Sequence, residues 1–158
     1  MNNIKKKIAI INGSNINLLG IREPQNYGTV KWEDIEKKLM RKASLSDIDL
    51  FFYQSNHEGK IVDYLQENLF QIDGVVINPA GFSYTGYSIL DTLKSIDIPY
   101  IEVHLSNVFV GGENCNNYKT LFMEHSKGFI CGLKSLVYEL GLEAIINYLN
   151  GEEHNGTK

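Results

Sequence analysis

Short apolar runs alternate with stretches of helical periodicity along the chain. Five runs rich in Ile, Val, Phe and Tyr are typical of buried strands, and they cover residues 7–12, 48–53, 73–78, 99–104 and 127–131. Between them, apolar residues spaced by three or four predict helices over residues 30–43, 84–96 and 133–149, and a further helix through Ile61, Leu65 and Leu69. Ser55 and Glu58 fit a capping box that would open this further helix.

The alternation of strands and helices predicts an α/β fold, because parallel strands need crossover connections. We expect a flavodoxin-like three-layer sandwich whose five-stranded parallel sheet has the order 2-1-3-4-5. One domain would cover residues 1–150, followed by a polar, disordered tail over residues 151–158. In such a sheet, ligands bind beyond the carboxyl ends of the strands.

Composition and charge exclude several classes of partner. The 158 residues carry a net charge of −4, which disfavours binding to nucleic acid or to anionic membranes. No apolar run approaches the roughly 18 residues of a membrane span, and the basic start leads into too short an apolar run for a signal peptide. Cys115 and Cys131 lack metal-ligand or redox spacing, and the histidines form no metal motif. We therefore expect a cytoplasmic protein that binds a small molecule and no metal.

Polar residues follow four of the predicted strands, over residues 12–17, 54–59, 78–81 and 102–107. Because the carboxyl ends of parallel strands meet at one edge of a sheet, we expect a site there. Asn, Ser and Gly are also ordinary turn residues, so these positions alone do not define a site. The glycines form neither a dinucleotide fingerprint nor a phosphate-binding P-loop. The first loop, up to Gly28, is longer than a turn requires, which is typical of a functional or a disordered segment.

Two residue pairs at this edge suggest acid–base chemistry. Glu102 and His104 alternate along the fourth strand and therefore face the same side of the sheet. Such a pair is either a satisfied polar contact or a carboxylate that orients a general acid. Arg22 and Tyr27 share the long first loop, and a guanidinium within about 4–6 Å of a phenol favours the phenolate, which is a base. Spacing alone leaves both alternatives open.

Several segments, in register along the chain, resemble the type II 3-dehydroquinate dehydratases. Residues 12–24 (NGSNINLLGIREP) are similar to the opening motif of that family, and Tyr27 stands where its catalytic tyrosine stands. Further matching segments are residues 54–59 (QSNHEG), 77–79 (INP), 101–107 (IEVHLSN) and 130–133 (ICGL). The resemblance covers roughly residues 7–147. It implies an enzyme of the shikimate pathway that needs no cofactor and forms homo-oligomers, as trimers or as a dodecamer of trimers.

The resemblance also implies the catalytic roles. Tyr27 would be the base that removes the C2 proton of 3-dehydroquinate, and Arg22 would favour its deprotonated form. Asn15 would hold a water that stabilises the resulting enolate. His104, oriented by Glu102, would protonate the departing C1 hydroxyl.

Substrate-binding roles follow in the same way. Asn78 and the backbone amides of Leu105 and Ser106 would bind the ring and its carboxylate. Asp91 matches an aspartate that approaches the site from a neighbouring subunit, and Tyr84 stands where the family has a substrate-contacting histidine.

The sequence departs from the family pattern on the side that recognises the ring hydroxyls. Tyr84 replaces the histidine, residues 109–118 contain no arginine, and Lys119 can offer only a single contact in its place. The leading hypothesis is dehydration of 3-dehydroquinate to 3-dehydroshikimate. The alternatives are a divergent lyase or isomerase that acts on a related cyclic keto acid, and a sensor or scaffold that only binds one.

Overall fold

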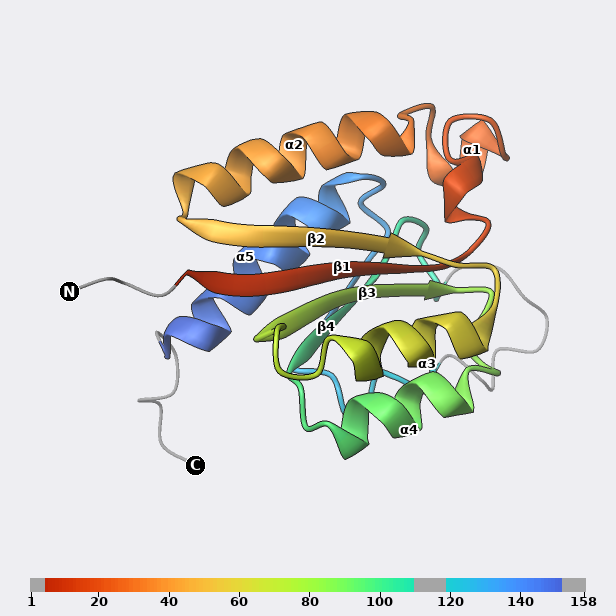
Figure 1. The fold of residues 1–158 in the computed structure, drawn as a ribbon. Helices are drawn as coiled ribbons and strands as arrows, with labels where there is room; N and C mark the ends of the chain where they lie inside the picture. The colour runs from red at the N-terminus through yellow and green to blue at the C-terminus, as the bar shows by residue number, and fades with distance from the viewer. Residues whose placement is uncertain (1–4, 110–118, 152–158) are drawn as a thin grey trace.

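The computed structural model describes residues 5–109 and 119–151, which contain a five-stranded parallel sheet (Figure 1). The strands are β1 (Lys6–Ser14), β2 (Ile48–Gln54), β3 (Gly74–Ala80), β4 (Tyr100–His104) and β5 (Gly128–Cys131). Their spatial order is β2-β1-β3-β4-β5, so the predicted flavodoxin-like topology is confirmed. The predicted tail, apart from Gly151, lies outside the described residues.

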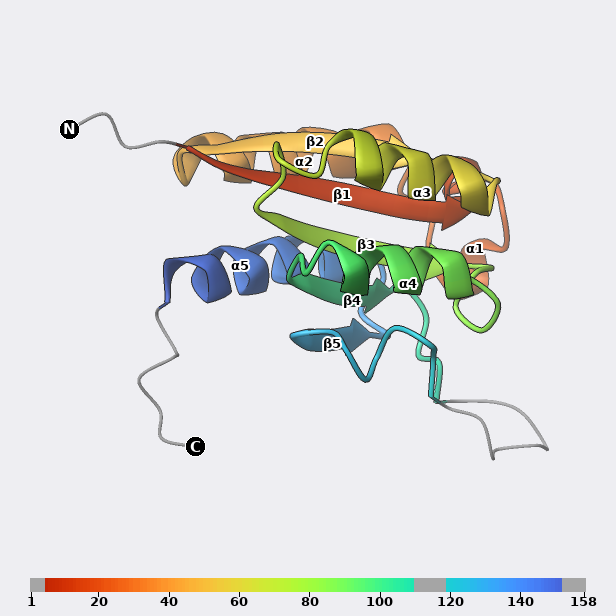
Figure 2. The ribbon, with the colours of Figure 1, turned by 60° about the horizontal axis from the view of Figure 1, so that its bottom comes forward.

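Helices cover both faces of the sheet (Figures 1 and 2). The longer helices are α2 (Trp32–Leu45), α3 (Glu58–Glu67), α4 (Tyr87–Ser95) and α5 (Leu136–Asn150). Ile8 and Ile10 of β1 join the core formed with α2 and α5, whereas Ala9 and Ile11 join the core formed with α3 and α4. Because β1 is buried on both faces, it shows a continuous apolar run rather than an alternating pattern. None of the helices within the described residues has the length and apolarity needed to cross a membrane.

Three helices begin later than predicted, among them α4, which begins at Tyr87 rather than at residue 84. α2 begins at Trp32, with Lys31 as its N-cap, rather than at residue 30. α5 begins at Leu136 rather than at residue 133. The delay in α5 has a backbone cause: Lys134 has a φ of 53°, which is left-handed and cannot belong to an α-helix.

The predicted capping box at the start of α3 is wrong. Ser55 Oγ accepts a hydrogen bond from the backbone N–H of His57 (3.0 Å) and not from that of Glu58, which a capping box requires. Glu58 Oε1 accepts a hydrogen bond from the backbone N–H of Ser88 in α4 (2.8 Å) instead of reaching back to the start of its own helix. Glu58 therefore links α3 to α4. The local sequence does not reveal that its partner is Ser88.

The carboxyl ends of β1, β2 and β3 point to one edge of the sheet (Figure 1). The long first loop folds there into two short helices, η1 (Ile16–Leu18) and α1 (Pro24–Tyr27). The loop that carries Arg22 and Tyr27 therefore lies at the edge where a doubly wound sheet binds its ligands.

Candidate active site

A pocket of about 270 Å³ opens at this edge of the sheet. Eight of the ten predicted site residues line it: Asn15, Arg22, Tyr27, Asn78, Tyr84, His104, Leu105 and Ser106. Glu102 lies behind His104, and Asp91 is an exposed residue of α4 that does not line the pocket. The approach of Asp91 to a neighbouring subunit stays a prediction. The fold thus brings together residues from loops that are widely separated in the sequence.

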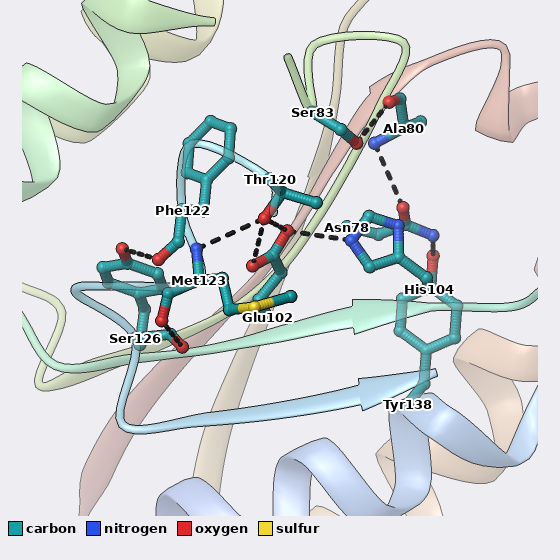
Figure 3. A network of polar contacts seen from close by, with 11 residues as sticks. Asn78, Ala80, Ser83, Glu102, His104, Thr120, Phe122, Met123, Ser126 and Tyr138 are labelled. Carbon is teal, nitrogen blue, oxygen red and sulfur yellow. Dashed lines mark hydrogen bonds and ion pairs between the residues drawn. The ribbon is translucent and has the colours of Figure 1, made fainter. Parts of the chain in front are cut away.

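A buried carboxylate holds the imidazole of His104 (Figure 3). His104 Nε2 lies 2.8 Å from Glu102 Oε1, and both residues are buried, Glu102 completely. The Thr120 hydroxyl donates to this carboxylate, 2.7 Å from Oε1 and 2.8 Å from Oε2, and accepts a hydrogen bond from the backbone N–H of Met123 (3.2 Å). Because Nε2 is engaged by Glu102, Nδ1 is the imidazole nitrogen left for a ligand in the pocket. Thr120, 18 residues from Glu102, was not among the predicted site residues.

Asn78 is fixed by a second buried network (Figure 3). Its Oδ1 accepts a hydrogen bond from the backbone N–H of Ala80 (3.2 Å), and its Nδ2 donates to the Tyr138 hydroxyl (2.8 Å). The Tyr138 hydroxyl in turn donates to Asn12 Oδ1 (2.7 Å). Complete burial raises the pKa of Tyr138, so this phenol keeps the proton that it donates. These bonds fix which way the Asn78 amide points.

The backbone at Asn15 is held by the QSNHEG segment. Asn15 has a left-handed φ of 67°, and its N–H donates to Asn56 Oδ1 (2.9 Å). Gln54 Nε2 donates to the same oxygen (3.1 Å) and to the carbonyl of Gly13 (3.2 Å). Gln54 and Asn56 therefore position Asn15 and are not themselves among the residues that line the pocket.

Arg22 and Tyr27 face each other on the first loop. The guanidinium carbon of Arg22 lies over the Tyr27 ring, 5.2 Å from its centroid, in a cation–π contact. Arg22 Nε donates to Glu23 Oε1 (3.3 Å), and Asn26 Nδ2 donates to Glu23 Oε2 (2.9 Å). Hydrogen bonds from Asn26 and Arg22 lower the pKa of Glu23. The charged Glu23 thus helps to orient Arg22 against Tyr27.

Backbone strain is concentrated around the pocket. Among the described non-glycine residues, six have positive φ, and Asn15, Glu23, Ala80 and Lys134 are the four that lie at this edge of the sheet. Left-handed backbone costs free energy in residues that carry a Cβ, so it persists where the surroundings impose it. The pocket is therefore a region whose geometry the tertiary structure enforces.

The predicted replacement for the missing arginine is occupied elsewhere. Lys119 Nζ donates to Glu124 Oε2 (2.7 Å), both side chains are exposed, and Lys119 does not line the pocket. This contact lowers the pKa of Glu124. Residues 110–118 lie outside the described residues. Over residues 5–109 and 119–151, no group of three His, Cys, Asp or Glu side chains is placed to hold a metal ion.

Comparison with known proteins gives a consistent result. Residues 6–146 match the family described as Dehydroquinase class II. The chain is 41% identical over 144 residues to the 3-dehydroquinate dehydratase of Aliarcobacter butzleri, covering 91% of this chain and 87% of that protein. It is 42% identical over 144 residues to the 3-dehydroquinate dehydratase of Endomicrobium trichonymphae, covering 91% and 99%. The crystal structure of type II dehydroquinase from Butyrivibrio crossotus matches with a TM-score of 0.82 and 37% identity, covering 92% of this chain and 98% of that chain.

Proposed function

Because the chain belongs to the class II dehydroquinase family, we propose that its pocket eliminates water from 3-dehydroquinate to give 3-dehydroshikimate. The protein is thus a hydro-lyase of the shikimate pathway. One observation carries the assignment of roles: Tyr27, with Arg22 beside its ring, and His104, with Glu102 behind it, line the same pocket. A base and an acid within reach of one bound ring are what a stepwise elimination requires.

Tyr27 performs the first step. Its phenolate, stabilised by the Arg22 cation, takes the C2 proton of the substrate, and the electrons of the C2–H bond form an enolate with the adjacent C3 ketone. Asn15 holds a water against the enolate oxygen, where negative charge develops. The ketone itself makes the C2 proton acidic, so the step needs no cofactor.

His104 performs the second step. The enolate returns its electrons to form the C1–C2 double bond as the C1–O bond breaks, and the imidazolium of His104 gives its proton to the departing hydroxyl, which leaves as water. Glu102 accepts a hydrogen bond from Nε2, so the acidic proton resides on Nδ1. A proton transfer from Tyr27 back to His104, through solvent, completes the cycle.

Asn78 and the backbone N–H groups of Leu105 and Ser106 bind the ring and its carboxylate. The network from Tyr138 holds Asn78 in one orientation, which suits a residue that must recognise a fixed substrate. Tyr84, about half exposed at the mouth, contacts the ring in place of a histidine. The similarities above give no support to a related cyclic keto acid as the substrate.

Two finer features also belong to the proposal. The family resemblance supports a homo-oligomer built of trimers, in which the exposed Asp91 would reach the pocket of a neighbouring subunit. A free thiol at Cys131 suits a reducing compartment, which supports a cytoplasmic location.

Turnover of 3-dehydroquinate by the purified protein, followed through the absorbance of the conjugated enone product, tests the proposal. We expect Tyr27→Phe to lower kcat by about 10²–10⁴-fold, because a phenyl ring cannot take a proton. Tyr64→Phe, which changes a partly buried tyrosine stacked on Tyr53, is the matched control and should keep the wild-type rate. Saturable binding of 3-dehydroquinate without turnover would instead indicate a sensor or scaffold.

A further inference from the structure

The side chain of Lys134 spans from the start of α5 to the loop that carries the proposed base. Its Nζ donates hydrogen bonds to the backbone carbonyls of Gln25 (3.2 Å) and Asn26, which are more than 100 residues away in sequence. Both carbonyls belong to α1, whose last residue is Tyr27. Lys134 therefore contacts the peptide units immediately before the proposed base.

These carbonyls are groups that α1 cannot satisfy by itself. A helix of four residues leaves its last carbonyls without partners inside the helix, and the negative end of its dipole attracts a cation. Within the described residues, no backbone N–H donates to the carbonyl of Gln25 or Asn26. The lysine ammonium supplies both the missing donors and the favourable charge.

The side of α1 that faces Lys134 is open. None of the four residues of α1 is fully buried: Tyr27 is partly buried and packs against the core, whereas Pro24, Gln25 and Asn26 are exposed. A hollow of about 450 Å³ lies between α1 and the ends of β4 and β5, and Lys134 is one of the residues that line it, together with Tyr27 and Ser106. On this open side, the Lys134 ammonium attaches α1 to the rest of the sheet edge.

The backbone of Lys134 is attached to the other half of the site. Its N–H donates to the carbonyl of Leu105 (2.9 Å), next to the amides that the substrate carboxylate would use. Two residues earlier, the N–H of Gly132 donates to the carbonyl of His104 (3.1 Å). One residue thus connects the loop of the base to the strand end of the acid.

Lys134 adopts this position at a conformational cost. Its φ of 53° is left-handed, a region that a glycine would occupy without strain. Retaining a lysine there makes sense if its side chain performs a task, since strained residues that persist are concentrated at functional sites. The two positive-φ aspartates of the described residues, Asp47 and Asp97, lie in turns away from the pocket and show no such contact with the first loop.

We propose that Lys134 is a positioning residue. By binding the carbonyls of Gln25 and Asn26, it keeps Tyr27 at a fixed position relative to His104 and to the backbone amides that bind the substrate carboxylate. This inference rests on the proposed role of Tyr27 as the base. Lys134 itself touches no reacting atom, so its loss should impair the placement of the base rather than the binding of the substrate.

Lys134→Met, which keeps the stem and removes the donors, tests the proposal directly. We expect kcat to fall about threefold to tenfold with little change in KM, because an exposed charge-assisted contact is lost while the carboxylate-binding groups remain. The amides of Asn26, Tyr27 and Gly28, which are hydrogen-bonded within α1, should exchange with deuterium faster, whereas the amides of β1 should not change. Lys134→Arg can donate to the same carbonyls and should restore most of both properties.

Lys134→Gly separates a positioning role from a purely structural one. It removes the backbone strain together with the ammonium, so the melting temperature should rise while kcat falls as in Lys134→Met. Asp97→Gly relieves the same kind of strain at a distant turn and should raise the melting temperature without changing kcat. Wild-type kcat and wild-type exchange of the α1 amides in both Lys134 variants would overturn the proposal.

The two proposals fail in different ways. If 3-dehydroquinate is not the substrate, the unaltered protein produces no enone, yet the α1 amides of Lys134→Met still exchange faster. If Lys134 does not hold the loop, the unaltered protein still converts 3-dehydroquinate to the enone. The exchange rates of the α1 amides are then the same in Lys134→Met and Lys134→Gly as in the unaltered protein.

Discussion

Replacing Thr120 by valine removes one hydroxyl from the centre of the proposed acid site. Valine has nearly the same shape, so the packing around it is retained. The Glu102 carboxylate, which is completely buried, loses the donor that lies 2.7 and 2.8 Å from its two oxygens. Among the described residues, the Glu102 side chain then keeps its hydrogen bond with His104 Nε2, which involves Oε1 alone.

The size of the effect follows from the burial of Glu102. A hydrogen bond to a charged group contributes about 1.5–3 kcal/mol, and a buried carboxylate oxygen has no water to replace it. For a domain of this size, 1 kcal/mol shifts Tm by about 2–4 °C, so we expect a decrease of roughly 5–10 °C. Correct placement of a general acid contributes about 10²–10⁴-fold to rate; a loosened Glu102 should remove part of this, about tenfold in kcat.

Thermal unfolding and steady-state turnover of 3-dehydroquinate measure the two effects. Thr120→Ser is the matched control, because it keeps the hydroxyl and removes only a methyl group; it should retain most of the wild-type Tm and kcat. If Thr120→Val matched Thr120→Ser in both Tm and kcat, the hydroxyl would not be what holds Glu102 and His104 in place.

Three further predictions concern the packing behind the site. Tyr138→Phe should destabilise the fold by about 2–4 kcal/mol in urea unfolding, because the buried Asn78 Nδ2 and Asn12 Oδ1 both lose their hydrogen bond to the Tyr138 hydroxyl; a loss below about 0.5 kcal/mol would contradict the network. Burial raises the pKa of Tyr138 above the unfolded value near 10. Its contribution to the free energy of unfolding is therefore complete below about pH 10 and decreases above it, by up to about 1.4 kcal/mol per pH unit. In urea unfolding at alkaline pH, Tyr138→Phe should make this decrease shallower. In Gly13→Ala the new Cβ would lie 2.0 Å from the carbonyl oxygen of Pro79 on the neighbouring strand, and we expect a loss of at least about 2 kcal/mol in thermal unfolding, whereas Gly59→Ala, with nothing within 4 Å of its Cβ, should not destabilise.

The elements and their order could be predicted because they depend on the local period of side chains. Ile8 and Ile11 lie within one apolar run because both faces of β1 are covered, and the run is visible without any knowledge of the fold. Glu102 and His104 could be paired from their alternation along one strand. The same local reasoning failed for Ser55 and Glu58, because the partner of Glu58 is Ser88, on a helix that the fold places beside it.

The amino-acid sequence by itself determined the sheet, its strand order and the edge where the chemistry-bearing residues meet, since these follow from periodicity and from the handedness of crossover connections. Only the tertiary structure decided which side chains hold the site residues in place. Thr120 hydrogen-bonds to Glu102, which is 18 residues away in the chain, and Tyr138 to Asn78, which is 60 residues away. Lys134 hydrogen-bonds to the carbonyls before Tyr27, which are more than 100 residues away. Contacts of this kind depend on which distant segments the folded chain brings within hydrogen-bonding distance, and no local pattern records them.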